Sequence, residues 1–196
     1  MRIFPAFLAP DRQRRLLADI HRVLAHAPLY SPRMPRSGSP YSVRMSNCGP
    51  LGWLSERDGY RYSPTHPVTL EPWPAMPEEV LDIWRETTGV GYKPEACLIN
   101  YYGPTARLGL HRDEDEQARE APILSISLGD TAIFRLGGPE RRSPTKSLRL
   151  ASGDVLVLSG PSRNWFHGVD RILPGTSGLL PEGGRINLTL RRVTLP

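Results

Sequence analysis

From residue 96 to its end, the chain alternates short apolar segments with turn residues and carries no helical pattern between them. The segments are rich in Ile, Leu and Val, and several alternate apolar with polar residues. They read ACLINYYG, PILSISLGDTAIFRL, KSLRL, DVLVLSG, NWFHGV and RINLTLRR, with Gly, Pro and Asp at the turns between them. Short strands in succession with no intervening helix predict an antiparallel sandwich, barrel or jelly roll.

The first half of the chain predicts two short helices, over residues 11–26 and 77–88. Asp11 can cap the first, while Pro77 stands at the first position of the second and Gly89 just beyond its end. The apolar residues at helical spacing are Leu16, Ile20, Val23 and Leu24 in the first helix and Val80, Leu81 and Trp84 in the second. Each helix therefore has one face to bury against the strands.

Much of the chain's proline lies between these helices, in residues 31–75, together with Gly, Ser and scattered aromatic residues. This punctuation predicts hairpins and loops over a surface, and loops on a rigid scaffold often carry binding residues. The alternative is an ill-ordered linker. A linker would leave Trp53, Tyr60 and Tyr62 exposed without a use, so we favour folded loops.

The length of 196 residues suits one well-cored domain. The net charge of +5 indicates either a polyanionic partner or a positive surface that only aids solubility. Cys48 and Cys97 cannot build a disulfide framework, which suggests a reducing compartment. The apolar start is interrupted by Pro5 and Pro10, unlike a signal peptide, and no apolar run is long enough to span a membrane. We expect a soluble, cytoplasmic monomer with no membrane partner.

Three residues of the strand region form a candidate metal site. Residues two apart on a strand share a face, so His111 and Asp113 can bind one ion, with Arg112 turned away. Antiparallel pairing can bring His167, in NWFHGV, beside them. Two histidines and one carboxylate are the ligand set of non-haem Fe(II) oxygenases. The alternatives are a surface ion pair for His111 and Asp113 and a core histidine bound to backbone for His167.

The segment RINLTLRR alternates strictly, with Ile186, Leu188 and Leu190 on the face that should pack in the core. The other face carries Arg185, Asn187, Thr189 and Arg191. Such a face is either exposed to solvent or turned toward a bound anion, because guanidinium groups are rarely buried unpaired. Two arginines on one face can converge on a small dicarboxylate, whose two carboxylates need two cations.

These features together resemble the AlkB family of Fe(II) and 2-oxoglutarate dependent dioxygenases. The resemblance rests on the metal triad, the Arg-x-Asn-x-Thr-x-Arg strand, NYY for the family's Asn-x-Tyr, and CGPLGW, GYRYSP and PWPAMP, which resemble the nucleotide-recognition lid of bacterial members. It runs from about residue 40 to 192, and the first 30 residues and the loop 170–184 lack a clear counterpart.

The resemblance implies a single domain, 1–196, that is mainly β with flanking helices (α+β). Its parts would be an N-terminal helical extension, 1–30, a nucleotide-recognition lid and helix, 31–95, and a double-stranded β-helix, or jelly roll, 96–196. The implied cofactors are Fe(II) and 2-oxoglutarate as cosubstrate, with O2.

The resemblance also implies roles for single residues. His111, Asp113 and His167 would be the catalytic iron ligands. Arg185 would pair with the distal carboxylate of 2-oxoglutarate, and Arg191 would lie near its keto-acid end. The remaining residues of the cosubstrate pocket would be Asn100, Tyr102, Leu108 and Asn187.

For the nucleotide, the resemblance implies that Trp53 stacks on the damaged base and that Tyr60 and Arg141 touch the nucleotide and its phosphate. Bases methylated at a ring nitrogen are cations, so Asp115, with Glu116 close by, would attract the lesion and accept a hydrogen bond from its exocyclic amine. A solvated acidic turn is the alternative for Glu114 and Glu116, and a packed lid core is the alternative for Trp53 and Tyr60.

The implied function is oxidative repair of 1-methyladenine and 3-methylcytosine in alkylated single- or double-stranded DNA, and in RNA, with release of formaldehyde and succinate. Such an enzyme needs a pocket for an extruded base, because the reactive atom of the base is inaccessible within a duplex. The alternatives are a 2-oxoglutarate-dependent hydroxylase of a protein or small molecule and a non-catalytic nucleic-acid binder.

Overall fold

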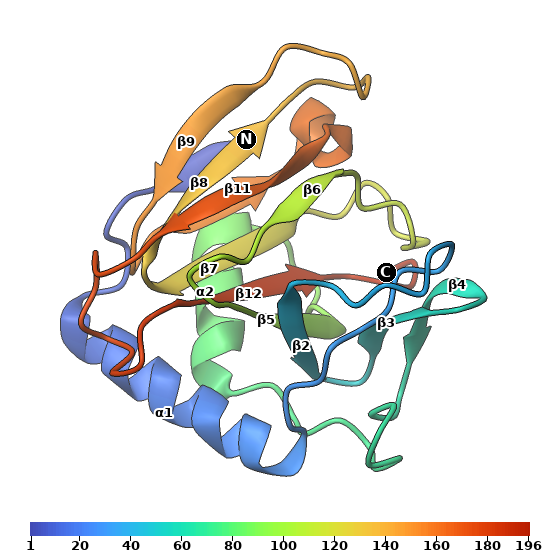
Figure 1. Cartoon of the computed structure of the whole chain (residues 1–196), viewed down its shortest axis with the longest axis horizontal. Helices are drawn as coiled ribbons and strands as arrows, with labels where there is room; N and C mark the ends of the chain where they lie inside the picture. The colour runs from blue at the N-terminus through green and yellow to red at the C-terminus, as the bar shows by residue number, and fades with distance from the viewer.

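The computed structural model describes residues 1–196, which form two antiparallel sheets packed face to face (Figure 1). The six-stranded sheet has the order β1 (Arg2–Phe4), β10 (Val155–Leu158), β7 (Ile123–Gly129), β12 (Arg185–Arg191), β5 (Ala96–Tyr102), β2 (Val43–Cys48). The four-stranded sheet has the order β6 (Leu108–His111), β11 (His167–Leu173), β8 (Thr131–Leu136), β9 (Lys146–Leu150). The predicted jelly roll is confirmed.

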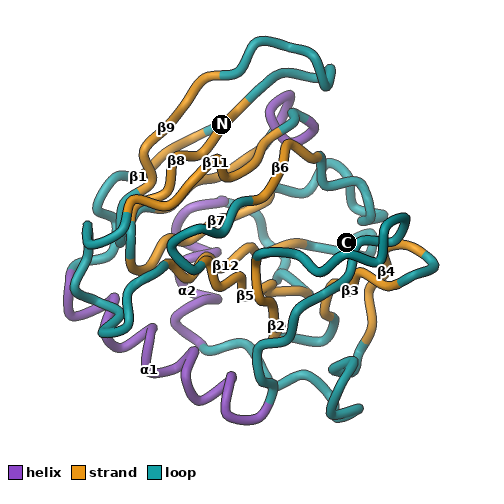
Figure 2. Tube along the Cα trace, in the orientation of Figure 1, coloured by secondary structure: helices purple, strands orange, loops and turns teal.

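The helices α1 (Pro10–His26) and α2 (Glu78–Thr88) lie together on the outer face of the six-stranded sheet (Figure 2). Their apolar faces join the sheet in one buried cluster, made by Leu16, Ile20, Val80, Ile83 and Trp84 from the helices and Ile99, Ile126, Leu128, Leu188 and Leu190 from the strands. This is the predicted apolar side of the RINLTLRR strand. Neither helix combines the length and the apolar character that crossing a membrane requires.

Both helices were predicted within one residue of their bounds, but Asp11 does not cap the first. Helix α1 begins at Pro10, because proline suits the first helical position, so Ala9 is the residue before it and no side chain caps the end. Asp11 lies in the first turn and pairs with Arg14. Gly89 ends α2 in the left-handed conformation, at a φ of 74°, as predicted.

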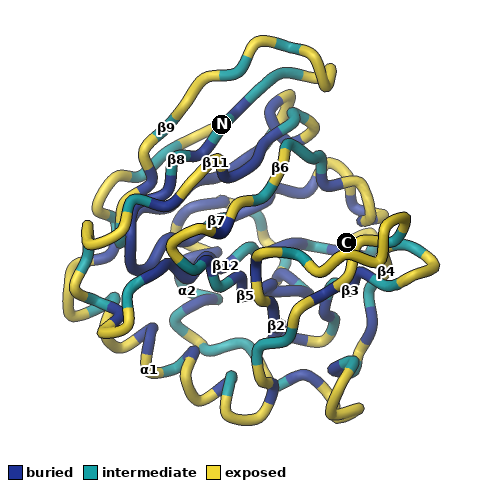
Figure 3. Tube along the Cα trace, in the orientation of Figure 1, coloured by how far each residue is buried: buried dark blue, intermediate teal, exposed yellow.

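A second cluster fills the space between the two sheets. It includes Met45, Leu98, Tyr102, Phe134, Leu156 and Val169. Figure 3 shows that the central strands of the six-stranded sheet are buried, whereas the loop that joins β8 to β9 is largely exposed. The apolar side chains of this cluster line the interior between the sheets.

Residues 31–75 fold into loops and a hairpin and do not form a linker. The hairpin consists of β3 (Gly52–Glu56) and β4 (Gly59–Ser63), and β2 joins the six-stranded sheet. Trp73 anchors the hairpin, since its indole donates to the carbonyl of Ser63 at 2.8 Å. A Cβ at Gly52 would stand 2.4 Å from that indole, so glycine permits this packing.

Two strand predictions need correction. Strand β6 ends at His111, so Asp113 lies in the following loop and not on the strand. Its backbone carbonyl accepts a hydrogen bond from Arg163 at 2.8 Å, in place of a ladder partner. In the segment NWFHGV the strand begins only at His167. The residues before it belong to a 3-10 turn, η1 (Gly160–Asn164), which Trp165 caps at its end.

The segment 170–184, which had no counterpart, begins as the second half of β11 and continues as a loop that leads directly into Arg185. The buried side chain of Asp130 holds this loop. Its Oδ1 accepts hydrogen bonds from the backbone of Thr176 and Ser177, at 3.0 and 3.1 Å, and its Oδ2 accepts one from Gly184 at 2.9 Å. One carboxylate thus satisfies three backbone donors just before the strand that enters the site.

Replacing Asp130 by alanine should lower the free energy of unfolding by about 3 kcal/mol, because three backbone N–H groups lose a charged acceptor. The measurement is urea denaturation followed by circular dichroism. Asp170→Ala is the control, since Asp170 forms only surface ion pairs, and should cost less than about 1 kcal/mol. Equal costs for the two variants would contradict the role given to Asp130.

Candidate metal centre and active site

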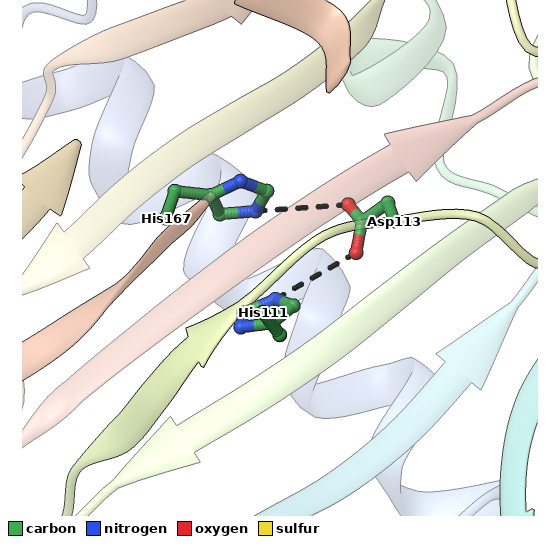
Figure 4. A group of neighbouring side chains, drawn as sticks. All are labelled: His111, Asp113 and His167. Carbon is green, nitrogen blue, oxygen red and sulfur yellow. Dashed lines mark ion pairs between the residues drawn. The ribbon is translucent and has the colours of Figure 1, made fainter. Parts of the chain in front are cut away.

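Two neighbouring strands and the loop after one of them bring the predicted metal ligands together. His111 ends β6 and lies directly opposite His167 on β11, and Asp113 follows two residues later. One ligand atom from each of the three side chains lies within 4.8 Å of the others. The carboxylate faces both rings, with His111 Nε2 3.6 Å from Oδ1 and His167 Nε2 3.8 Å from Oδ2 (Figure 4). The geometry is that of a site for one ion.

The backbone fixes the tautomer of both histidines. Nδ1 of His111 lies 3.0 Å from the carbonyl oxygen of Gly109, and Nδ1 of His167 lies 3.0 Å from that of Trp165. A carbonyl can only accept, so each Nδ1 carries a proton and each Nε2 is the nitrogen that faces the carboxylate. Burial lowers the pKa of His167 to about 4, so this ring is neutral at pH 7 and ready to bind a metal.

The third ligand is an ionised carboxylate. Burial by itself would raise the pKa of Asp113, but nearby positive charge, that of Arg191 above all, outweighs burial and lowers it. Arg191 donates to Asp113 Oδ2 through Nη2 at 3.0 Å and through Nε at 3.2 Å. The site therefore offers a negative charge and two imidazole Nε2 atoms to a divalent cation.

Close approach of β11 to β6 depends on Gly168, the residue after His167. A Cβ there would stand 2.6 Å from the carbonyl oxygen of Leu108 and 2.8 Å from that of Gly109. Any larger residue would push the strands apart and separate the two imidazoles. The sequence alone did not single out this glycine.

A cavity of about 490 Å³ opens beside the metal ligands. All six residues predicted for the cosubstrate line it: Asn100, Tyr102, Leu108, Arg185, Asn187 and Arg191. Three of them bury a polar atom with no hydrogen-bond partner, namely Oδ1 of Asn100, Nε of Arg185 and Nη1 of Arg191. Buried polar groups are normally satisfied, so these atoms indicate a polar ligand of this cavity.

The surroundings of Arg185 indicate the charge that this ligand should carry. Its side chain is 1% exposed, yet it donates only to neutral partners, Ser127 Oγ at 2.9 Å and the carbonyl of Leu150 at 3.2 Å. Burial lowers its pKa to about 10, so the guanidinium remains charged at pH 7. A buried cation without an ion-pair partner favours an anion, and the distal carboxylate of 2-oxoglutarate fits it.

Arg191 differs from the expectation that both arginines of the strand stand free for a dicarboxylate. It is already paired with Asp113, and its Nε lies 3.4 Å from Glu116. The loop after β6 runs past this end of β12 and supplies both carboxylates. Only Nη1 of Arg191 is left for a ligand, so Arg185 is the one uncompensated cation of this strand.

The β3–β4 hairpin forms one wall of the cavity mouth. The Trp53 indole donates to Asp115 Oδ2 at 2.8 Å, and Tyr60 stacks on Trp53 with ring centroids 5.3 Å apart and planes 25° apart. The Asn47 side chain accepts a hydrogen bond from the backbone N–H of Trp53 at 3.0 Å and donates one to the carbonyl of Trp53 at 3.2 Å. Trp53, Tyr60 and Asp115 therefore lie together beside His111, and all four line the cavity.

Two predicted nucleotide contacts have different surroundings. Arg141 lines the cavity and lies over the ring of Phe166, with its guanidinium carbon 5.8 Å from the centroid. Glu116 does not line it. Glu116 is 3% exposed and bonds Arg163 and Tyr62, so the solvated-turn alternative is wrong for this residue. Glu114 is exposed and pairs with Arg112, as that alternative expected.

Sequence reasoning missed Arg163, a residue of η1 that is 1% exposed. Its three nitrogens bind the carbonyls of Ala121 and Asp113 and the carboxylate of Glu116. Nothing in the segment PSRNW distinguishes this arginine from a surface residue. Only the arrangement of the loops around it shows that it is buried.

A family model described as the 2OG-Fe(II) oxygenase superfamily matches residues 1–191. The chain is 52% identical over 190 residues to the alpha-ketoglutarate-dependent dioxygenase AlkB homolog of Caulobacter vibrioides, covering 97% of this chain and 86% of that one. It is 45% identical to AlkB of Escherichia coli, covering 91% and 83%. The chain belongs to the AlkB family of this superfamily.

The solved structure of OsALKBH1 superposes with a TM-score of 0.84 at 30% identity, covering 97% of this chain and 95% of that one. The fold class is therefore confirmed by comparison as well as by the two sheets. As a 2OG-Fe(II) oxygenase, the protein uses Fe(II), 2-oxoglutarate and O2, and its ionised carboxylate, two imidazoles and unpaired Arg185 suit the metal and the cosubstrate.

Replacing His111 or Asp113 by alanine should abolish the conversion of 2-oxoglutarate to succinate, because two ligands hold the metal poorly. Succinate release and Mn(II) binding are the measurements, with folding checked by circular dichroism. Normal turnover in either folded variant would contradict the triad.

Replacing Arg185 by alanine should weaken 2-oxoglutarate binding by about 1.5–3 kcal/mol, roughly ten- to a hundredfold, since a charge-assisted pair is lost. Arg171→Ala is a matched control, because Arg171 is exposed on β11. An unchanged affinity in Arg185→Ala would mean that the cosubstrate carboxylate binds elsewhere.

Proposed function

We propose that the protein removes alkyl groups from the ring nitrogens of nucleic-acid bases, with 1-methyladenine and 3-methylcytosine as substrates. The observation that carries the proposal is the acid and aromatic pair Asp115 and Trp53 beside the iron ligand His111. Relatives over part of the chain support demethylation of bases in nucleic acid, though not the choice of ring nitrogens: one of Arabidopsis thaliana is named a DNA N(6)-methyladenine demethylase, and one of Schizosaccharomyces pombe a tRNA demethylase. Both DNA and RNA are therefore included.

The hairpin would clamp the extruded base as a lid. Trp53 and Tyr60 offer stacked rings for a base drawn out of its helix, and His111 would lie on the other side of that base. Asp115 Oδ2 accepts a hydrogen bond from the indole of Trp53, and Oδ1 of the same carboxylate would accept one from the exocyclic amine of the base. Arg141, at the mouth, would meet the nucleotide phosphate.

Bound iron, 2-oxoglutarate and O2 supply the oxidation of the N-methyl carbon, with formation of succinate and carbon dioxide. The hydroxymethyl base then loses formaldehyde and recovers its ring nitrogen. The chain's own part is to hold the cosubstrate at Arg185, to present two imidazoles and the Asp113 carboxylate to the metal, and to seat the base over His111. The buried walls of the cavity limit the access of water to it.

The proposal predicts demethylation of a single-stranded oligonucleotide that carries one 3-methylcytosine. Intact mass should show the loss of the methyl group, and formaldehyde should appear in equal amount. Asp113→Ala is the negative control. Turnover of 2-oxoglutarate without demethylation of any methylated DNA or RNA oligonucleotide would contradict the proposal and favour a protein or small-molecule substrate. We also propose that the protein acts in the cytoplasm as a monomer. Cys48 and Cys97 are free and buried, and free thiols suit a reducing compartment.

Replacing Asp115 by alanine should slow demethylation of cationic 3-methylcytosine far more than it slows uncoupled 2-oxoglutarate turnover, because iron and cosubstrate keep their ligands. Neutral 3-methylthymine should lose less activity than 3-methylcytosine. The measurement is the ratio of the two rates, in wild type and variant, at one salt concentration, since phosphate attraction varies with salt. An unchanged ratio would show that the Asp115 charge does not recognise the base.

A further inference from the structure

Glu116 is a buried acid with exposed neighbours on both sides in the loop after β6. Its neighbours Glu114, Asp115, Gln117 and Glu120 are exposed, whereas the Glu116 side chain is almost entirely enclosed. It does not line the cavity, so neither cosubstrate nor base meets it there. A buried carboxylate is costly unless it is fully paired, and this residue therefore needs an explanation.

Both oxygens of Glu116 are occupied. Oε2 accepts from Arg163 Nη2 at 2.9 Å, while Oε1 accepts from the Tyr62 hydroxyl and lies 3.4 Å from Arg191 Nε. These partners come from three separate elements, namely the turn η1, the strand β4 and the strand β12. Glu116 thus joins the hairpin, the turn before His167 and the arginine that binds Asp113.

The four charged groups of this network balance. Asp113 and Glu116 are negative, Arg163 and Arg191 are positive, and all four are buried. If Glu116 lost its charge, Asp113 would be the single carboxylate facing two buried guanidinium groups. Asp113 is also the only anionic ligand in the metal triad.

Asp113 Oδ2 has two competing demands. It accepts both hydrogen bonds from Arg191, and it faces His167 Nε2, where the metal binds. Glu116 offers Arg191 a second carboxylate. Each unit of uncompensated positive charge near Oδ2 opposes the arrival of a dication, and in a buried setting this effect is weakly screened.

We propose that Glu116 is a positioning residue of the iron site, which balances the charges of Arg163 and Arg191 so that the carboxylate of Asp113 remains available to the metal. The residue acts through Arg191 and touches neither substrate nor metal. The inference concerns metal binding and goes beyond the proposed nucleic-acid substrate, so its test needs no nucleic acid.

The experiment is titration of the full-length protein with Mn(II), a redox-inert stand-in for Fe(II), by the electron paramagnetic resonance of free Mn(II). Glu116→Gln keeps the size of the side chain and removes the charge. Its dissociation constant should rise about tenfold or more, as for other groups that act behind metal ligands. Glu120→Gln makes the same change in the exposed part of the loop and should stay within about twofold of wild type, because solvent screens its charge.

Two further variants separate charge from packing. Glu116→Asp disturbs the packing but keeps the charge, so it should bind Mn(II) more tightly than Glu116→Gln even where its melting temperature is as low. The double variant Glu116→Gln with Arg163→Gln restores neutrality and should recover affinity relative to Glu116→Gln alone.

A packing role predicts the opposite pattern. The proposal is overturned if the aspartate and glutamine variants weaken Mn(II) binding equally, or if the double variant binds no better than the single one. Should Glu116→Gln fail to fold, Glu116→Asp and the double variant decide, since both keep the charge balance. A loss of about tenfold in both would then overturn the proposal.

Discussion

The register between β6 and β11 is the constraint on which the rest of the site depends. It sets His111 directly opposite His167, and the close contact that this requires is possible because Gly168 has no side chain. A shift of one residue would turn one histidine to the other face of the sheet. The carboxylate of Asp113 reaches both rings only because the strand ends at His111 and the loop turns inward.

The cavity between the two sheets has an unpaired buried arginine at one end and a paired one at the other. Arg185 lies at one end of the cavity with neutral partners only, which makes that end a receptor for an anion. At the other end, Arg191 shares two carboxylates, and the balanced charges leave an ionised ligand for a dication. An anion is thus attracted to Arg185 and a dication to Asp113, at two different places along the polar face of β12.

Several parts of this arrangement could be predicted from local patterns. The alternation of RINLTLRR correctly separated the core residues Ile186, Leu188 and Leu190 from the residues that line the cavity. Arg163 and Glu116 could not be predicted, since each looks like an ordinary surface charge beside its sequence neighbours. Their burial follows from three loops that meet around them, and β1 escaped prediction because three residues carry too little pattern.

The sequence by itself determined the succession of antiparallel strands, the two helices with one apolar face each, and the residue types able to bind iron and a dicarboxylate. These depend on periodicity and turn residues, which act over a few neighbouring positions. Only the tertiary structure decided that Arg185 is unpaired while Arg191 is shared, and that Asp115 faces the cavity while Glu116 is buried behind it. The physical reason is that the cost and the effect of a buried charge depend on its neighbours in space, and these come from segments far apart in the chain.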